Sequence, residues 1–416
     1  MVLDIDRERF VETMEHQAEI GANEDGGLDR LALTDADRAV RDWFEDQLEA
    51  LDLDTRVDEM GNMFGRRQGA TDEGAVLLGS HLDSQPNGGI YDGPLGIVAA
   101  LEFVRTLEDE GIETERPVEV VNWTNEEGSR FQPAMMASEV WAGKTSVEAA
   151  DETTDDEGVR FDDALERIGY RGDAPAEPHD EYDSYLELHV EQGPFLDRGG
   201  HDVGVVTGIV GLQWGEITFH GEANHTGTTP MQYRSDALVA ASDVVTQIRR
   251  LPGTLGERTV ATTGDISVEP GSINIIPETV RFTFDLRDPD DDVIAEGLER
   301  VRAEMEAAAE REGVEWEYEE RMSAGSVDFV DRCVSAVREA AADLGHDARE
   351  MVSGAGHDAT HAASVCDTAM VFAVSEGGKS HTPEEYTSWD DCHAAAETYA
   401  NAALRLAGVA DGGDPV

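Results

Sequence analysis

The sequence predicts an α/β fold: a mostly parallel sheet with flanking helices, interrupted by a smaller α+β domain. Short apolar runs typical of buried strands lie at residues 75–79, 117–123, 184–190 and 368–374. Helical patterns fall around these runs, at 94–110, 327–343 and 389–408. Strands that alternate with helices in this way indicate a layer of largely parallel, buried strands.

Two further helices are predicted near the start of the chain. Helical periodicity covers residues 4–20 and resumes after Thr34, whose hydroxyl group suits an N-cap. Residues 146–182 instead are rich in Asp, Glu, Gly and Pro and have few apolar positions. We expect this segment to be a poorly packed surface excursion.

The order of elements changes in the segment 206–322. Strands are predicted at 212–220, 259–269, 279–287 and 314–320, with helices at 233–250 and 291–312. This βαββαβ series is typical of a ferredoxin-like unit. We therefore expect one domain to comprise residues 1–205 and 323–416, and a second, inserted domain to comprise residues 206–322.

The chain is strongly acidic, with 90 Asp and Glu against 31 Lys and Arg and a formal charge of −59. Affinity for phosphate comes mainly from Lys and Arg clusters, so a nucleic-acid binder is excluded. Only Lys144 and Lys379 are lysines, and the acidic residues are scattered along all segments. This pattern indicates a halophilic surface, with an acidic mesophilic protein as the alternative.

Several features point to a soluble cytoplasmic protein without a membrane partner. No apolar run approaches the ~18 residues that span a bilayer, and the first residues lack a signal-peptide pattern. The three cysteines, Cys333, Cys366 and Cys392, lack C-x-x-C spacing. Neither a disulfide framework nor a thiolate zinc site is therefore indicated.

Residues that can bind metal follow four of the predicted central strands. They are His81 with Asp83, the pair Glu126 and Glu127, His189, and His381, while Asp92 lies in a Gly-containing loop before a helix. Taken singly, each has an ordinary alternative: a satisfied core histidine, a helix-capping aspartate, a solvated pair of acids or an exposed polar strand face.

The common location of these residues is stronger evidence for a metal site than any single residue. The carboxyl ends of strands are where open α/β sheets bind ligands. Histidine and carboxylate ligands without thiolate suit zinc or a similar divalent ion. Five such ligands with one bridging carboxylate would hold two ions about 3.5–4 Å apart.

These residues, in this order, resemble the motifs of the hydantoinase/carbamoylase family of binuclear metal amidohydrolases, within the aminoacylase and carboxypeptidase clan. The motifs are GSHLDSQPNGG, YDGPLGIVAALE, NWTNEEGSRFQPAMM, LELHVEQGP, HTGTTPM, GSINIIP, SGAGHDA and GGKSHTPEE, spanning residues 79–385. The resemblance implies two divalent ions per subunit, zinc or else manganese, cobalt or nickel. Their ligands would be His81, Asp92, Glu127, His189 and His381, with Asp92 bridging.

The resemblance also implies roles for residues around these ligands. Glu126 would be the general base that deprotonates the attacking water, and Asp83 would orient His81. Gln192 would contribute a polar contact to substrate, and Gly356 would let the main chain approach it. The alternative for Gln192 is that it satisfies loop backbone.

The inserted domain resembles a lid and dimerisation module. His225 would stabilise the developing oxyanion across a homodimer interface, and Arg287 would clamp the substrate carboxylate. Asn274 would add a further polar contact. The alternatives are a solvent-exposed His225, a surface ion pair between Arg287 and Asp285, and an Asn274 that satisfies loop backbone.

We therefore expect a homodimeric enzyme that hydrolyses N-carbamoyl-L-amino acids to the amino acid, carbon dioxide and ammonia. The alternatives are an amidohydrolase of allantoate or another ureido compound, an aminoacylase or peptidase, and a metal-binding protein without turnover. Arg287, Asn274 and the motif HVEQGP favour the ureido substrates over peptides.

The acidic surface generates a prediction about salt. In ~1 M salt the Debye length falls to about 3 Å, which screens the repulsion that opposes a compact state. Dialysis into dilute buffer should therefore unfold the protein or abolish its activity, as followed by circular dichroism and an activity assay. Full activity in dilute buffer would reject the halophilic interpretation.

Overall fold

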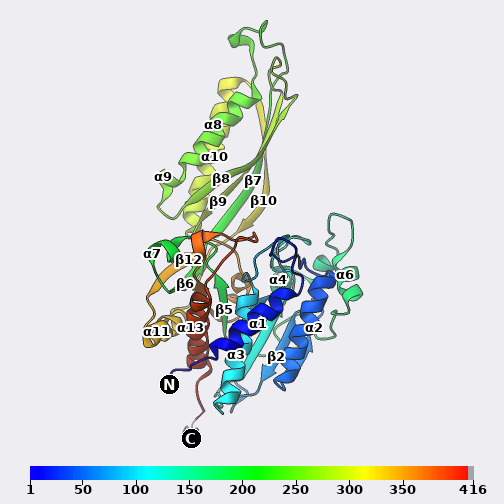
Figure 1. Cartoon of the computed structure of the whole chain (residues 1–416). Helices are drawn as coiled ribbons and strands as arrows, with labels where there is room; N and C mark the ends of the chain where they lie inside the picture. The colour runs from blue at the N-terminus through cyan, green and yellow to red at the C-terminus, as the bar shows by residue number, and fades with distance from the viewer. Residues whose placement is uncertain (411–416) are drawn as a thin grey trace. The chain divides into compact units, whose positions relative to one another are not determined.

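The structure is a computed structural model that describes residues 1–410, in two compact units (Figure 1). The first unit combines Met1–Thr207 with the chain from Phe329 onward, and the second is Gly208–Asp328. The inserted domain was predicted at residues 206–322, and the second unit covers residues 208–328. None of the helices in the described part of the chain could cross a bilayer by its length and apolar content.

A mixed sheet forms the centre of the first unit, in the order β1-β2-β4-β3-β5-β13-β6, with β12 also paired to β6. Its strands are β1 (Asp54–Val57), β2 (Met63–Arg67), β3 (Ala75–His81), β4 (Val118–Trp123), β5 (Tyr182–Val190), β6 (Val203–Ile209), β12 (Ala348–Ser353) and β13 (Asp367–Ala373). The four central strands β4, β3, β5 and β13 are parallel, and their outer neighbours β2 and β6 are antiparallel. The predicted α/β class is confirmed, and the four central strands pair in parallel.

The central strands are buried on both faces because helices cover the sheet. Every residue of β3 and β4 is buried, and on β5 both Leu188 and its neighbour His189 are buried. An exposed polar face on this strand is therefore excluded. The covering helices are α1 (Arg7–Glu19), α2 (Asp35–Ala50), α3 (Pro94–Asp109), α11 (Asp331–Leu344) and α13 (Trp389–Ala407).

Two helix starts bear directly on the sequence analysis. The Thr34 side chain caps α2 by accepting a hydrogen bond from the Asp37 N–H, as predicted. The N-cap of α3 is Gly93, and no side chain caps this helix. The helix-capping alternative for Asp92 is therefore wrong.

The expectation of a poorly packed excursion at 146–182 is wrong. The segment contains α5 (Val147–Asp151) and α6 (Phe161–Ile168), and one face of α6 is buried. Phe161 packs edge-on against Phe131, with ring centroids 5.3 Å apart. The acidic residues of α6 occupy its other face, so overall composition concealed an amphipathic helix.

The second unit is a four-stranded antiparallel sheet in the order β10-β7-β9-β8. Its elements are β7 (Gly211–His220), α8 (Ala237–Arg250), β8 (Val260–Glu269), β9 (Thr279–Asp288), α10 (Asp291–Glu312) and β10 (Glu315–Ala324). Alternate residues of β9 are buried, including Phe282 and Leu286, and pack in one core with Val244 of α8 and Met305 of α10. Chain order and strand order are those of a ferredoxin-like domain.

The remaining elements are short connections. They are α4 (Met136–Trp141), α7 (Phe195–Gly199), η1 (Met231–Tyr233), α9 (Pro252–Leu255), β11 (Val327–Asp328), α12 (Ala359–Ala362) and η2 (Glu376–Gly378).

Candidate metal centre

The predicted ligands meet at the carboxyl edge of the four parallel strands. His81 is the last residue of β3, and His189 is the penultimate residue of β5. Glu127 lies in the loop after β4, and His381 in the loop after β13. Asp92 lies in the loop just before α3, so five segments distant in sequence contribute to one cluster.

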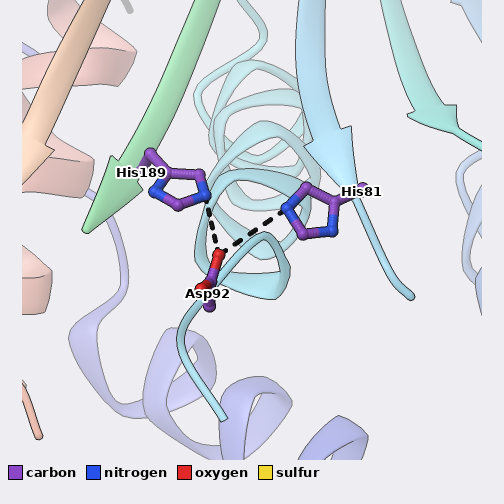
Figure 2. Close-up of side chains that lie close together, drawn as sticks. All are labelled: His81, Asp92 and His189. Carbon is purple, nitrogen blue, oxygen red and sulfur yellow. Dashed lines mark ion pairs between the residues drawn. The ribbon is translucent and has the colours of Figure 1, made fainter. Parts of the chain in front are cut away.

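The first group of candidate ligands is His81, Asp92 and His189, all buried (Figure 2). Figure 2 shows both imidazole rings pointing toward the Asp92 carboxylate. Asp92 Oδ1 lies 2.9 Å from His189 Nε2 and 3.7 Å from His81 Nε2. Three ligand atoms thus surround one point from two strand ends and a loop.

The second group shares Asp92 and adds Glu127 and His381. In this group the second oxygen of Asp92 faces the partners. His381 Nε2 lies 3.4 Å from Asp92 Oδ2 and 3.6 Å from Glu127 Oε2. Each oxygen of Asp92 therefore faces a different set of partners. This is the arrangement of a carboxylate that bridges two cations.

Hydrogen bonds of the other ring nitrogens favour metal binding by both buried histidines. His81 Nδ1 lies 2.9 Å from the Asp83 carbonyl oxygen, and His189 Nδ1 lies 2.9 Å from that of Val190. An Nδ1–H that donates to a carbonyl leaves Nε2 with a free lone pair. His81 Nε2 is buried without a hydrogen-bond partner. An orphaned nitrogen that faces a carboxylate fits a cation between them.

Burial is the first cause of most pKa shifts in the cluster. It raises the pKa of Glu126 well above its usual value, with a further contribution from the charge of Asp358, and it lowers the pKa of His81 to about 4. Against burial, Asp92 raises the pKa of His189 to about 9, and His189 holds the pKa of Asp92 well below its usual value. A neutral His81 and an ionised Asp92 are the forms that bind a cation, whereas His189 would lose its proton when a cation binds.

The Asp83 carboxylate positions the tandem glutamates. Its two oxygens accept hydrogen bonds from the main-chain N–H groups of Glu126 and Glu127, at 3.2 and 3.3 Å. Asp83 contacts His81 through its main-chain carbonyl group, because its carboxylate is 3.8 Å from His81 Nδ1. Glu126 Oε2 lies 3.5 Å from His81 Nε2, so this carboxylate borders the first group of ligands.

Gly93 is required by the close approach of the Asp92 loop to His81. Its φ is +83°, a conformation that side chains other than glycine rarely adopt. A Cβ at this position would also overlap the His81 imidazole ring.

Two predicted substrate contacts lie in the first unit. Gln192 Nε2 donates hydrogen bonds to Asp92 Oδ2 at 3.0 Å and to Ser380 Oγ at 3.1 Å, so its amide group borders the second group of ligands. Gly356 lies against Met135, whose Cε would be 2.9 Å from an added Cβ.

The three predicted residues of the second unit do not form one cluster. His225 and Asn274 lie in adjoining exposed loops, where the Asn274 carbonyl group accepts a hydrogen bond from Thr226 N–H. Arg287 pairs with Asp285, with Nε 3.0 Å from each carboxylate oxygen.

Strand register fixes how far these residues lie apart. Arg287 is opposite Leu212 at the start of β7, whereas His225 follows the end of that strand at His220. At about 3.3 Å per residue these two ends of β7 are roughly 25 Å apart. Arg287 and His225 therefore lie at opposite ends of one sheet.

Two contributors to the site escaped sequence analysis. Gln85 donates to Glu127 from its side chain at 2.8 Å and from its main chain at 3.1 Å. Glu187 is buried and accepts hydrogen bonds from Ser80 Oγ and the Ala359 N–H. Gln85 lies in a quoted motif, but nothing in its spacing distinguishes it from a turn residue, and Glu187 looked like part of an exposed strand face.

Comparison with known proteins places the chain in a family. The pattern of peptidase family M20/M25/M40 matches residues 77–405. An N-carbamoyl-L-amino-acid amidohydrolase of Rhizobium meliloti is 40% identical, covering 98% of both chains. An allantoate amidohydrolase of Bacillus subtilis is 34% identical, covering 90% of this chain and 92% of that protein.

A solved structure extends the comparison to the fold. It is an amidase of the hydantoinase/carbamoylase family from Burkholderia multivorans, with a TM-score of 0.93 and 43% identity over 97% of this chain and 98% of that one. Fold and site thus define an amidase of the M20 class. The chain belongs to the hydantoinase/carbamoylase family within peptidase family M20/M25/M40, and the resemblance seen in its motifs is confirmed.

The geometry of the first group generates a prediction about metal content. His81→Ala removes a buried ligand nitrogen and should lower the metal bound per subunit, as measured by elemental analysis after gel filtration. His16→Ala changes an exposed histidine outside the cluster and is the control. Undiminished metal in His81→Ala would contradict the ligand assignment.

Proposed function

We propose that the chain is a binuclear metal amidohydrolase that hydrolyses N-carbamoyl-L-amino acids to the amino acid, carbon dioxide and ammonia. The observation that carries this proposal is the Asp92 carboxylate, whose two oxygens face two separate sets of ligands. The substrate class is supported by the Rhizobium meliloti relative, which matches this chain along nearly its whole length.

The five ligand side chains offer only nitrogen and oxygen atoms. Such a set suits two zinc ions, and it also admits manganese, cobalt or nickel. When bound, divalent ions increase the acidity of water and polarise the carbonyl group of a substrate. His81, Asp92 and His189 would hold one ion, and Asp92, Glu127 and His381 the other.

Glu126 is proposed as the general base and acid. Its carboxylate would take a proton from the attacking water and then deliver it to the leaving nitrogen as the C–N bond breaks. Burial and the charge of Asp358 raise the pKa of its carboxyl group, and a raised pKa supports this role because it makes the carboxylate a stronger base. Asp83 would assist by fixing the main chain of Glu126.

The separation of Arg287 from His225 supports a homodimer. The ends of the sheet beside Arg287 and His225 are roughly 25 Å apart, and a carbamoyl amino acid is too small to contact both. If Arg287 holds the substrate carboxylate while His225 and Asn274 contact the ureido end, the two ends must come from different copies. We therefore propose that a partner subunit supplies His225.

The setting of the enzyme is proposed to be a salt-rich cytoplasm. The charge of −59 supports adaptation to high salt, as argued from the composition. The cysteines Cys333, Cys366 and Cys392 are all free thiols, which fits a reducing compartment.

An allantoate amidohydrolase is the second candidate, favoured by the Bacillus subtilis relative. A hydrolysis screen at high salt with added divalent metals would distinguish the candidates. The substrates tested are carbamoyl amino acids, β-ureidopropionate, allantoate and dipeptides, and release of ammonia or of free amino acid is measured. We expect carbamoyl-L-amino acids to give the highest kcat/KM. A clear preference for allantoate would select the second candidate, and cleavage of dipeptides alone would reject both.

The role of Glu126 generates a prediction. Glu126→Gln keeps the size of the side chain but cannot accept a proton from water, so kcat should fall by about 10²- to 10⁴-fold while metal content stays unchanged. Steady-state kinetics and elemental analysis on the same preparation measure both quantities. Full activity in this variant would remove Glu126 from the role of general base.

The homodimer generates another prediction. His225→Ala and Glu126→Gln should each be nearly inactive, but mixed dimers of the two would contain one site in which both residues are intact. Activity should therefore return when the two variants are unfolded together and refolded at high salt, with each variant refolded alone as control. No return, despite mixed dimers shown by differently tagged chains, would place His225 outside the partner's site.

A further inference from the structure

The loop that carries Asp92 is held by a carboxylate that is not among the proposed ligands. Glu385 is buried, with 5% of its surface exposed, and lies four residues after His381. Its Oε1 accepts hydrogen bonds from the main-chain N–H groups of Tyr91 at 3.3 Å and Asp92 at 3.2 Å. The main chain of Asp92 is thus fixed by a side chain from the loop of His381.

The second oxygen of Glu385 connects the same two loops through Ser380. Glu385 Oε2 lies 3.0 Å from Ser380 Oγ, which is 3.1 Å from Asp92 Oδ2. Ser380 directly precedes His381 in the chain. The Ser380 hydroxyl group has one proton, so it can donate to Glu385 or to Asp92, and it lies within hydrogen-bond distance of both carboxylates.

Gly89 provides the space for this carboxylate. A Cβ built on Gly89 would overlap the carboxylate group of Glu385. The carboxylate can move aside only by breaking its hydrogen bonds to Tyr91 and Asp92, because it is buried and held there. A side chain at position 89 would thus act on Asp92 through Glu385, although Gly89 itself binds no ligand atom.

We propose that Glu385 is a positioning residue of the metal centre, which sets the bridging geometry of Asp92, and that Gly89 is glycine to admit its carboxylate. This inference rests on the proposed function, because it takes Asp92 as the carboxylate shared by two cations. Partners that orient metal ligands typically contribute about 10- to 100-fold to metal affinity or activity. The adjacent Glu384 is exposed and pairs with Lys379, so it provides a matched control.

The test measures zinc affinity and stoichiometry of the metal-free full-length chain by competition with a chromophoric chelator at high salt. Glu385→Ala should weaken zinc binding by about 10- to 100-fold, whereas Glu384→Ala should leave it unchanged. Glu385→Gln should bind nearly as wild type. Its amide oxygen can accept the same two N–H bonds, and its NH₂ group can donate to Ser380. Equal zinc affinity in Glu385→Ala and wild type would overturn the proposal.

A double-mutant cycle gives a readout that general destabilisation would not produce. Gly89→Ala should weaken zinc binding in the wild-type background but have little further effect in Glu385→Ala, because the overlapping carboxylate is then gone. Additive effects would overturn the proposal. If Glu385→Ala does not fold, the other two variants test the proposal. Unchanged zinc binding in Gly89→Ala would overturn it, and so would loss of zinc binding in Glu385→Gln. If the wild-type chain binds no zinc, the same measurements are made with manganese, cobalt and nickel, and a chain that binds none of the four metals would reject the proposed function.

Discussion

The shared carboxylate of Asp92 is the interaction on which the proposed chemistry depends. Its Oδ1 faces His81 and His189, and its Oδ2 faces His381, so two sets of ligands have one residue in common. A buried carboxylate in such a position is costly unless positive charge compensates it. Two cations would provide that charge, and their separation would be set by the width of a single carboxylate group.

The fold makes this arrangement by bringing strand ends together. Parallel strands place their carboxyl ends at one edge, and each central strand contributes a candidate ligand there or in the loop that follows. The surrounding hydrogen bonds then fix orientation: carbonyl groups set the tautomers of His81 and His189, and Asp83 holds the main chain of Glu126. The chemistry thus rests on a rigid sheet, while the polar residues themselves lie mostly on loops.

The sequence predicted the central strands and the clustered candidate ligands because both leave a local signal. Apolar runs marked all four parallel strands, and a polar residue at each end marked the site. The outer strands β1, β2, β6 and β12 escaped, since short strands that pair at the sides of a sheet have weaker patterns. Helix α6 was hidden by its acidic face. Glu385 and Gln85 could not be found, because a hydrogen bond between distant loops has no spacing in sequence.

The bridging geometry of Asp92 can be measured directly. A crystal grown with zinc at high salt, with data collected on both sides of the zinc absorption edge, would locate each ion by its anomalous scattering. Our account predicts two peaks about 3.5–4 Å apart, one beside His81 and His189 and one beside Glu127 and His381, with Asp92 between them. A single peak, or two peaks that do not share Asp92, would contradict it.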